Sequence, residues 1–193
     1  MKKVTRPELF RWRDNSLSLA SKLGYDPQVL ETVRSRTIFD LVDNLPKLPG
    51  NPSLIFGICR YGPTNCLIEV QRENVSTLLN KQSVQAMLPF LGQIGALEEE
   101  IKEIEEVLEG IPEETFYETF NQSGMDHELM GHAYDYFSEP GKYSFFNGPS
   151  EDSAVRTQLR FARERAKENE YWQAIFKIMP KVLRHLKNIP GVK

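Results

Sequence analysis

The spacing of apolar residues predicts that the chain begins with two helices. Apolar side chains recur at helical intervals over residues 7–23. A second helical pattern starts at Asp26-Pro27, since aspartate is a preferred N-cap and proline suits the first helical position. This second pattern carries apolar residues as far as Val42. Residues 1–50 are therefore predicted to form a helical N-terminal part.

Two strand-like runs follow a stretch rich in proline and glycine. The runs cover residues 53–61 and 65–71, and the short segment Gly62-Pro63-Thr64 joins them. Glycine and proline in so short a connection are typical of a tight turn. The pattern predicts a β-hairpin over 53–71.

The remaining pattern is mostly helical. Helices are predicted within 74–137, including an acidic amphipathic helix over 96–109. A loop rich in Gly, Pro, Ser and Asn covers 138–150, after which apolar spacing predicts one long C-terminal helix over 151–189. The predicted fold class is thus α+β and mainly helical, in a single compact domain over residues 1–193.

Composition and charge narrow the classes of function. The 193 residues are 40% hydrophobic and carry a formal net charge of −3, which is ordinary for a globular protein. There is no basic excess to attract nucleic acid or an anionic membrane, and no apolar run as long as a membrane span. We therefore expect no nucleic-acid partner and no membrane partner.

Cysteine content and the start of the chain predict a cytoplasmic location. There are two cysteines, Cys59 and Cys66, and the first residues lack the apolar run of a signal peptide. We expect both cysteines to be buried, reduced thiols. A pair facing across the hairpin turn and a metal-binding role are the alternatives.

The informative segment is His127-Glu128-Leu129-Met130-Gly131-His132, which lies inside a predicted helix and holds two of the three histidines. The histidines are five residues apart, about 140° around a regular α-helix, so regular geometry would point them to different faces. A π-bulge brings residues five apart onto one face, and Gly131 makes such a distortion easier. We therefore predict a bulged turn over 127–132, with both imidazole rings on one metal ion.

This segment resembles the HExxGH variant of the zinc motif in gluzincin metallopeptidases, best known from the dipeptidyl peptidase III family. The resemblance covers six residues. It implies a zincin-like fold, in which an active-site helix is followed by a helix that supplies a glutamate ligand. By that resemblance His127 and His132 bind Zn²⁺, and Glu128 is the general base for a metal-activated water.

The gluzincin pattern also implies a third ligand in a Glu-x-x-Ala sequence, which Glu151-Asp152-Ser153-Ala154 matches. Glu151 is therefore the expected third ligand, although an acid in a first helical turn is also favoured by the helix dipole. The other acidic candidates are Asp152, Glu164, Glu168 and Asp135. Asp135 is alternatively an outer partner of an imidazole.

Two further roles follow from the resemblance. A side chain outside the motif helix stabilises the oxyanion, and we expect Tyr143 in that role; the other candidates are Tyr171, Arg156 and His185. The substrate of a zincin commonly lies along an exposed edge strand, for which 66–70 is the candidate. The alternative is a hairpin that only covers the helical core.

The sequence thus predicts a zinc metallopeptidase that acts on a peptide or protein substrate. Two other functions remain open. One is a non-catalytic, zincin-like protein that binds metal or a partner, with the acidic helix over 96–109 and the basic tail as its interaction surfaces. The other is a metal-dependent hydrolase of a non-peptide amide. Two imidazoles and one carboxylate suit zinc, although iron, cobalt and manganese are alternatives.

Overall fold

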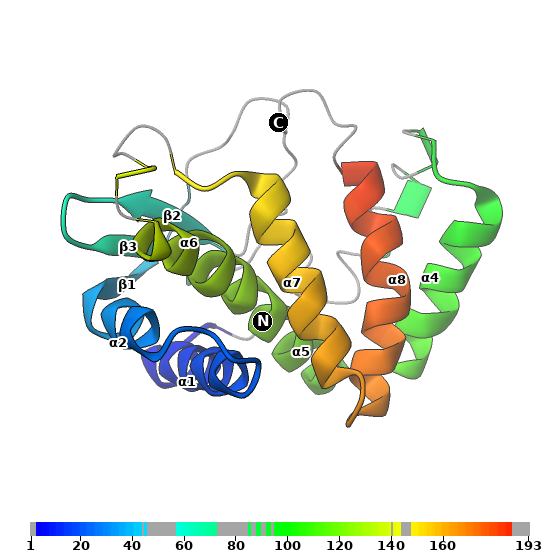
Figure 1. Ribbon diagram of the computed structural model, residues 1–193. Coiled ribbons are helices and arrows are strands. Elements are labelled where there is room, and N and C mark those ends of the chain that lie inside the picture. Colours follow the sequence, from blue (N-terminus) through cyan, green and yellow to red (C-terminus); the bar gives the residue numbers. More distant parts are fainter. Residues whose placement is uncertain are drawn as a thin grey trace. The chain divides into compact units, whose positions relative to one another are not determined.

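The computed structural model describes residues 3–43, 45, 57–72, 85, 88–89, 92–93, 95–139, 141–143 and 148–186, with side chains described as far as residue 181. Within them the protein is mainly helical with one small sheet, which confirms the α+β class (Figure 1). The helices are α1 (Arg6–Lys22), α2 (Pro27–Arg36), α4 (Glu98–Gly110), α5 (Glu113–Met125), the π-helix η1 (Asp126–Ala133), α6 (Tyr134–Ser138), α7 (Glu151–Arg165) and α8 (Glu170–Leu186). The strands are β1 (Thr37–Val42), β2 (Gly57–Tyr61) and β3 (Cys66–Gln71).

Packing divides the chain into two compact units. The first comprises residues 1–45, 55–74 and 122–161, and the second comprises 46–54, 75–121 and 162–193. All of the motif residues and Glu151 fall in the first unit. The single domain expected from the sequence stays a prediction, because two compact units can belong to one domain or to two.

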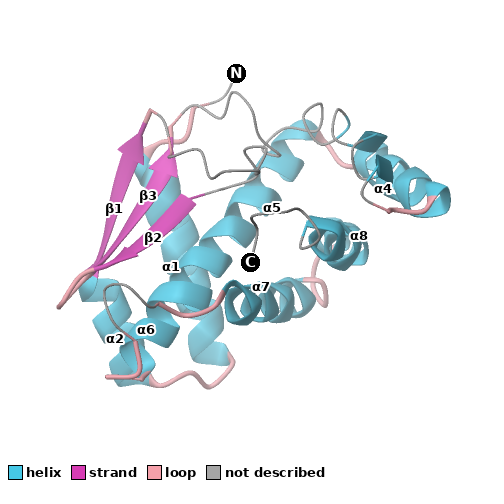
Figure 2. Cartoon of the chain, turned by 90° about the horizontal axis from the view of Figure 1, so that it is seen from above, coloured by secondary structure: helices cyan, strands magenta, loops and turns pink. Residues whose placement is uncertain are grey.

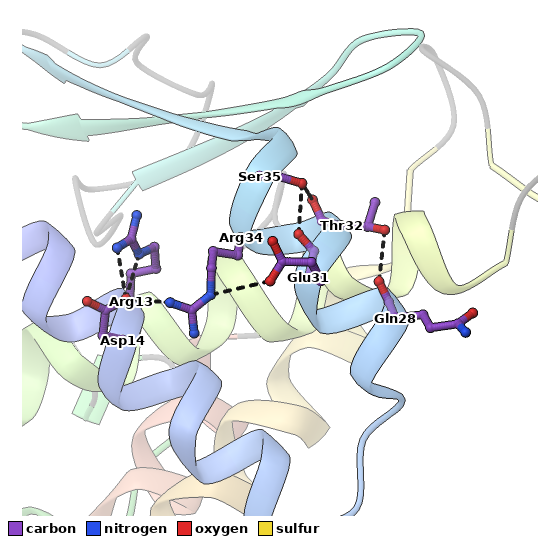
Figure 3. A network of polar contacts seen from close by, with 7 residues as sticks. All are labelled: Arg13, Asp14, Gln28, Glu31, Thr32, Arg34 and Ser35. Atoms are coloured by element: carbon purple, nitrogen blue, oxygen red, sulfur yellow. Dashed lines mark hydrogen bonds and ion pairs between the residues drawn. The ribbon is translucent and has the colours of Figure 1, made fainter.

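The first two helices form as their sequence predicts. The Asp26 side chain caps α2 by accepting hydrogen bonds from the backbone N–H groups of Gln28 and Val29. Gly24, with φ of +78°, lets the chain turn between the helices. On their outer faces, Asp14 of α1 pairs with Arg34 of α2, which also contacts Glu31 (Figure 3). These pairs are exposed, so each contributes little to stability.

The sheet has the strand order β1-β3-β2 (Figure 2). Strand β1 runs parallel to β3 with Thr37 opposite Cys66, and β2 runs antiparallel to β3 with Tyr61 opposite Cys66. The predicted hairpin is therefore confirmed over its described part. The helical prediction for the N-terminal part is wrong at residues 37–42, where burial alternates and Thr37 and Phe39 point inward. Pairing with β3 satisfies the backbone of this β-branched segment, which overrides its weak helical pattern.

The position of β3 corrects a second expectation. Residues 66–70 do not lie at an edge, because β1 and β2 pair with β3 on its two sides. The face that carries Cys66, Ile68 and Val70 is fully buried. Among the described strands, β1 and β2 form the edges, and β2 is the one with extensive contacts to η1.

Buried apolar side chains of α1, α2, the sheet, η1 and the first part of α7 form the core of the first unit. Within η1, Leu129, Met130 and Ala133 are completely buried. Contacts join η1 to α1 and to β2. This burial on both sides holds the motif helix in a defined position.

In the second unit, α4 contacts α8, and Glu103 forms ion pairs with Lys177 and Lys181. The predicted helix over 151–189 is wrong as one element, because the chain leaves the helix at 166–169. Asn169 then caps α8 through its side-chain oxygen. Most of the predicted helical segment 74–94 lies outside the described residues. A search of the described helices found none with the length and apolarity to cross a membrane.

Candidate metal centre

The histidine motif lies in a π-helix, as its spacing predicts. Hydrogen bonds in a π-helix join residues five apart. Two residues with this spacing therefore lie on the same face of the helix, about one turn from each other. In η1 the ring centroids of His127 and His132 are 4.9 Å apart. The helical run continues through α5, η1 and α6 without a break (Figure 1). The expected bulge over 127–132 is confirmed within Asp126–Ala133.

Buried polar contacts anchor the first turn of η1 to α1. The Asp126 side chain is fully buried and accepts a 2.6 Å hydrogen bond from the Ser16 hydroxyl. The Gln122 amide donates to Asp126 and to the backbone carbonyl of Trp12. Removing these donors would take hydrogen bonds from a buried carboxyl, which costs free energy. These hydrogen bonds join α1 and the last turn of α5 to the first residue of η1.

Gly131 serves close packing. The sequence interpretation assigned it to backbone distortion, but Gly131 is not among the glycines with positive φ. A Cβ atom there would lie 2.4 Å from Cα and 2.7 Å from Cβ of Ala154 in α7. Only glycine allows this approach of the two helices. Gly131 and Ala154 therefore belong together as a contact that brings α7 onto the motif helix.

The N-terminus of α7 places Glu151 beside both histidines. Its two carboxylate oxygens lie 3.2 Å from Nε2 of His127 and 3.2 Å from Nε2 of His132. Ser153, in the same turn, donates a 2.6 Å hydrogen bond to the carboxylate of Asp135 in α6. The contact between Gly131 and Ala154 and the hydrogen bond between Ser153 and Asp135 hold the start of α7, and with it Glu151, next to the histidines.

The two imidazoles and the carboxylate form a donor set that could hold a metal ion. One ligand atom from each of His127, His132 and Glu151 lies within 4.8 Å of the other two. Glu151 is 54% exposed at its side chain, whereas His132 is 6% exposed. The cluster is thus open to solvent on the glutamate side, as a site that binds substrate requires.

The charges of the cluster influence one another strongly. The hydrogen bonds from His127 and His132 hold the pKa of Glu151 far below its usual value. Burial alone would lower the pKa of His132, but the hydrogen bond to Glu151 and the nearby carboxylates outweigh burial and raise that pKa. These shifts favour an imidazolium next to a carboxylate when no metal is bound.

Glu128 lies in a different environment. It is only 6% exposed, and burial raises its pKa while the two histidines pull it back. The backbone N–H of Cys59, in β2, donates a hydrogen bond to its carboxylate. A Cβ at Gly57 would lie in ordinary contact with Cγ of Glu128, at 3.6 Å, but only 2.8 Å from the backbone oxygen of Glu69. A raised pKa in a buried carboxyl next to a candidate metal site is typical of a general base.

Tyr61 is the residue that sequence reasoning missed. Its hydroxyl lies 3.0 Å from Nδ1 of His132, on the opposite side of the ring from Glu151. Nothing in the local sequence marks it, because it ends a strand 71 positions away from the histidine. The pairing of Tyr61 with Cys66 across the hairpin puts it on the sheet face that contacts η1.

Two other candidates, Tyr143 and Asp135, have different partners. Tyr143 sits in the turn after Gly141, where the Lys142 ammonium is 5.0 Å from its ring. No polar contact of the described residues joins Tyr143 to the cluster. Asp135 accepts from Ser153 and not from an imidazole. The role of Tyr143 as oxyanion stabiliser stays a prediction, as do those of Tyr171 and Arg156; the side chain of His185 lies outside the described part of the chain.

Both cysteines are free thiols, and the structure buries Cys66 fully and Cys59 in part. They lie diagonally across the hairpin, since Cys59 is opposite Ile68 and Cys66 is opposite Tyr61. A hydrogen bond to Cys66 and burial raise the pKa of Cys59 well above its usual value. The expected reduced thiols are consistent with this environment.

None of the known protein-family models, curated proteins or solved structures matches this chain. The function must therefore be argued from the geometry of the cluster.

Proposed function

We propose that the protein is a zinc-dependent peptide hydrolase with a zincin-like active site. The observation that carries this proposal is the convergence of His127, His132 and Glu151 on one position, next to the buried carboxyl of Glu128. Three protein ligands leave the fourth position of a tetrahedral zinc open, which is the arrangement of catalytic sites.

The metal ion and Glu128 have different roles in the proposed reaction. A zinc ion held there supplies a water of lowered pKa and polarises a carbonyl oxygen. Glu128 accepts the proton of the attacking water and passes it to the leaving amine nitrogen. The hydrogen bond from the Cys59 N–H holds the Glu128 carboxylate in place for both transfers.

The outer edge of β2 supports an extended peptide as the substrate. Strand β2 is an edge strand in contact with η1, and the N–H of Cys59 on this strand already reaches Glu128. An extended chain can add to such an edge by backbone hydrogen bonds. The edge strand proposed to hold substrate is therefore β2, in place of residues 66–70.

The test is cleavage by protein loaded with one equivalent of zinc. Glu128→Gln keeps the size and hydrogen-bond acceptor of the side chain but cannot take a proton. We expect it to bind zinc like the wild type and to cleave casein or an unstructured peptide library about 10²- to 10⁴-fold more slowly.

Glu139→Gln is the matched control, because Glu139 is exposed and paired with Lys142 outside the cluster. It should cleave like the wild type. A wild-type protein that binds zinc and cleaves neither substrate would contradict the proposal and favour a metal-binding interaction protein.

A further inference from the structure

We propose that Tyr61 is a positioning residue that orients the His132 imidazole for metal binding. This inference rests on the proposed metal centre and adds a role for a residue outside the motif. The hydroxyl of Tyr61 and the carboxylate of Glu151 contact the two nitrogens of the same ring, at 3.0 Å and 3.2 Å. Together they leave the imidazole one orientation.

The ring of Tyr61 is itself held from several sides. It stacks on Tyr136 with a centroid distance of 4.8 Å and an angle of 25°. Tyr136 in turn donates a 2.9 Å hydrogen bond to the carbonyl of Gly62, in the hairpin turn next to Tyr61. A Cβ atom at Gly148 would lie 2.0 Å from the Tyr61 ring, so backbone packs directly on it. The hydroxyl is therefore fixed before any metal binds.

A hydroxyl suits both states of the centre. When Nε2 of His132 binds a metal, Nδ1 must carry the proton, and the Tyr61 oxygen can accept it. Without metal, an imidazolium donates from Nε2 to Glu151 and from Nδ1 to the Tyr61 oxygen, whereas a neutral ring protonated at Nε2 accepts at Nδ1 from the Tyr61 hydroxyl. The same contact thus orients the ring with and without metal, and Tyr61 adds no negative charge in its neutral form.

The experiment compares Tyr61→Phe with wild type by zinc competition against a chromophoric chelator. Phenylalanine keeps the ring, its stacking on Tyr136 and its packing on Gly148. Because partners of this kind typically contribute 10- to 100-fold to metal affinity, we expect the zinc Kd to rise about 10- to 100-fold.

A spectroscopic readout separates orientation from general stability. In zinc-loaded wild type labelled with ¹⁵N, the Nδ1–H of His132 should appear as a signal that exchanges slowly with water. In Tyr61→Phe this signal should be lost to exchange, because no oxygen accepts the proton. A change in packing alone would lower the free energy of unfolding and leave this signal in place.

Tyr136→Phe is the matched control, because it removes a hydroxyl from the same stack that contacts backbone and no imidazole. Its zinc Kd should stay within about threefold of wild type. The role of Tyr61 would be overturned if both variants lost the same zinc affinity. It would also be overturned if Tyr61→Phe kept both the zinc Kd and the Nδ1–H signal of the wild type.

Two other outcomes can be told apart from a failure of the proposed role of Tyr61. Wild-type protein that binds no zinc would overturn the metal centre itself, whatever the variants do. If Tyr61→Phe does not fold, the wild-type spectrum decides: a slowly exchanging Nδ1–H supports the contact, and a rapidly exchanging one overturns it.

Discussion

At the scale of single residues, Glu128 shows a conflict between chemistry and stability. A carboxyl that must accept a proton has to lie beside the substrate, yet its burial disfavours the ionised form. The Cys59 N–H and the two histidines offset part of that cost. The raised pKa of Glu128 in the folded protein therefore predicts a pH-dependent loss of stability.

We expect Glu128→Gln to be more stable than wild type in metal-free protein at pH 7 and equal to it at pH 4. The folded pKa exceeds the unfolded value of about 4.3, so folding loses stability as the pH rises from that value through the folded pKa. Glutamine never ionises and escapes this loss. Urea unfolding of chelator-treated protein at both pH values measures the difference.

The exposed Glu139→Gln serves as the reference, since its environment predicts little change at either pH. If Glu128→Gln were less stable than wild type at pH 7, or gained as much free energy of unfolding at pH 4 as at pH 7, ionisation of Glu128 would not explain the difference in stability.

At the scale of elements, the site depends on how closely α7 approaches η1. Gly131 and Ala154 are in direct contact, and the Ser153–Asp135 hydrogen bond joins α7 to α6 nearby. Glu151 lies three residues before Ala154, so any outward shift of α7 moves the carboxylate away from the histidines. The same small residues that allow tight packing thereby determine the geometry of the cluster.

Gly131→Ala should lower the free energy of unfolding by about 1–3 kcal/mol and weaken zinc binding as well. The added methyl overlaps the backbone of Ala154, so the helices must separate. Chemical denaturation and chelator competition give the two quantities.

Gly110→Ala, at the end of α4, is the matched substitution, because nothing lies within 4 Å of the added Cβ. It should change stability by less than about 0.5 kcal/mol. Normal zinc affinity in a destabilised Gly131→Ala would show that Glu151 does not depend on this contact.

At the scale of the whole molecule, the three candidate ligands all come from the segment 122–161 of the first unit, but from two different helices. The histidines come from η1 and the glutamate from α7, and residues 134–150 separate these two helices along the chain. A metal bound by all three stabilises the folded arrangement, since an unfolded chain does not present the three groups together.

Zinc should therefore raise the free energy of unfolding, by about 2.7 kcal/mol when free zinc is 100 times its Kd. Urea titrations with buffered zinc and with chelator measure the gain. In Glu151→Ala the gain should largely disappear, whereas Asp152→Ala in the same helical turn should keep it. An equal gain in Glu151→Ala would place the bound zinc elsewhere.

Local pattern predicted the parts of the site that depend on nearby residues. The five-residue spacing of His127 and His132 in a helical segment calls for a π-turn, and η1 has it. The resemblance to gluzincins points to Glu151 as third ligand, and in the structure Glu151 lies next to His127 and His132. Local pattern failed at residues 37–42, because a β-branched segment takes its conformation from the strand beside it.

The amino-acid sequence by itself determined the helical motif, its two imidazoles on one face and the capped start of α2, because these follow from backbone hydrogen bonding within a few residues. Tertiary structure alone decided that β3 is central and β2 the edge, that Gly131 serves the contact with Ala154, and that Tyr61 meets His132. Those features join segments distant along the chain, and burial and strand register, which no local pattern encodes, bring such segments together.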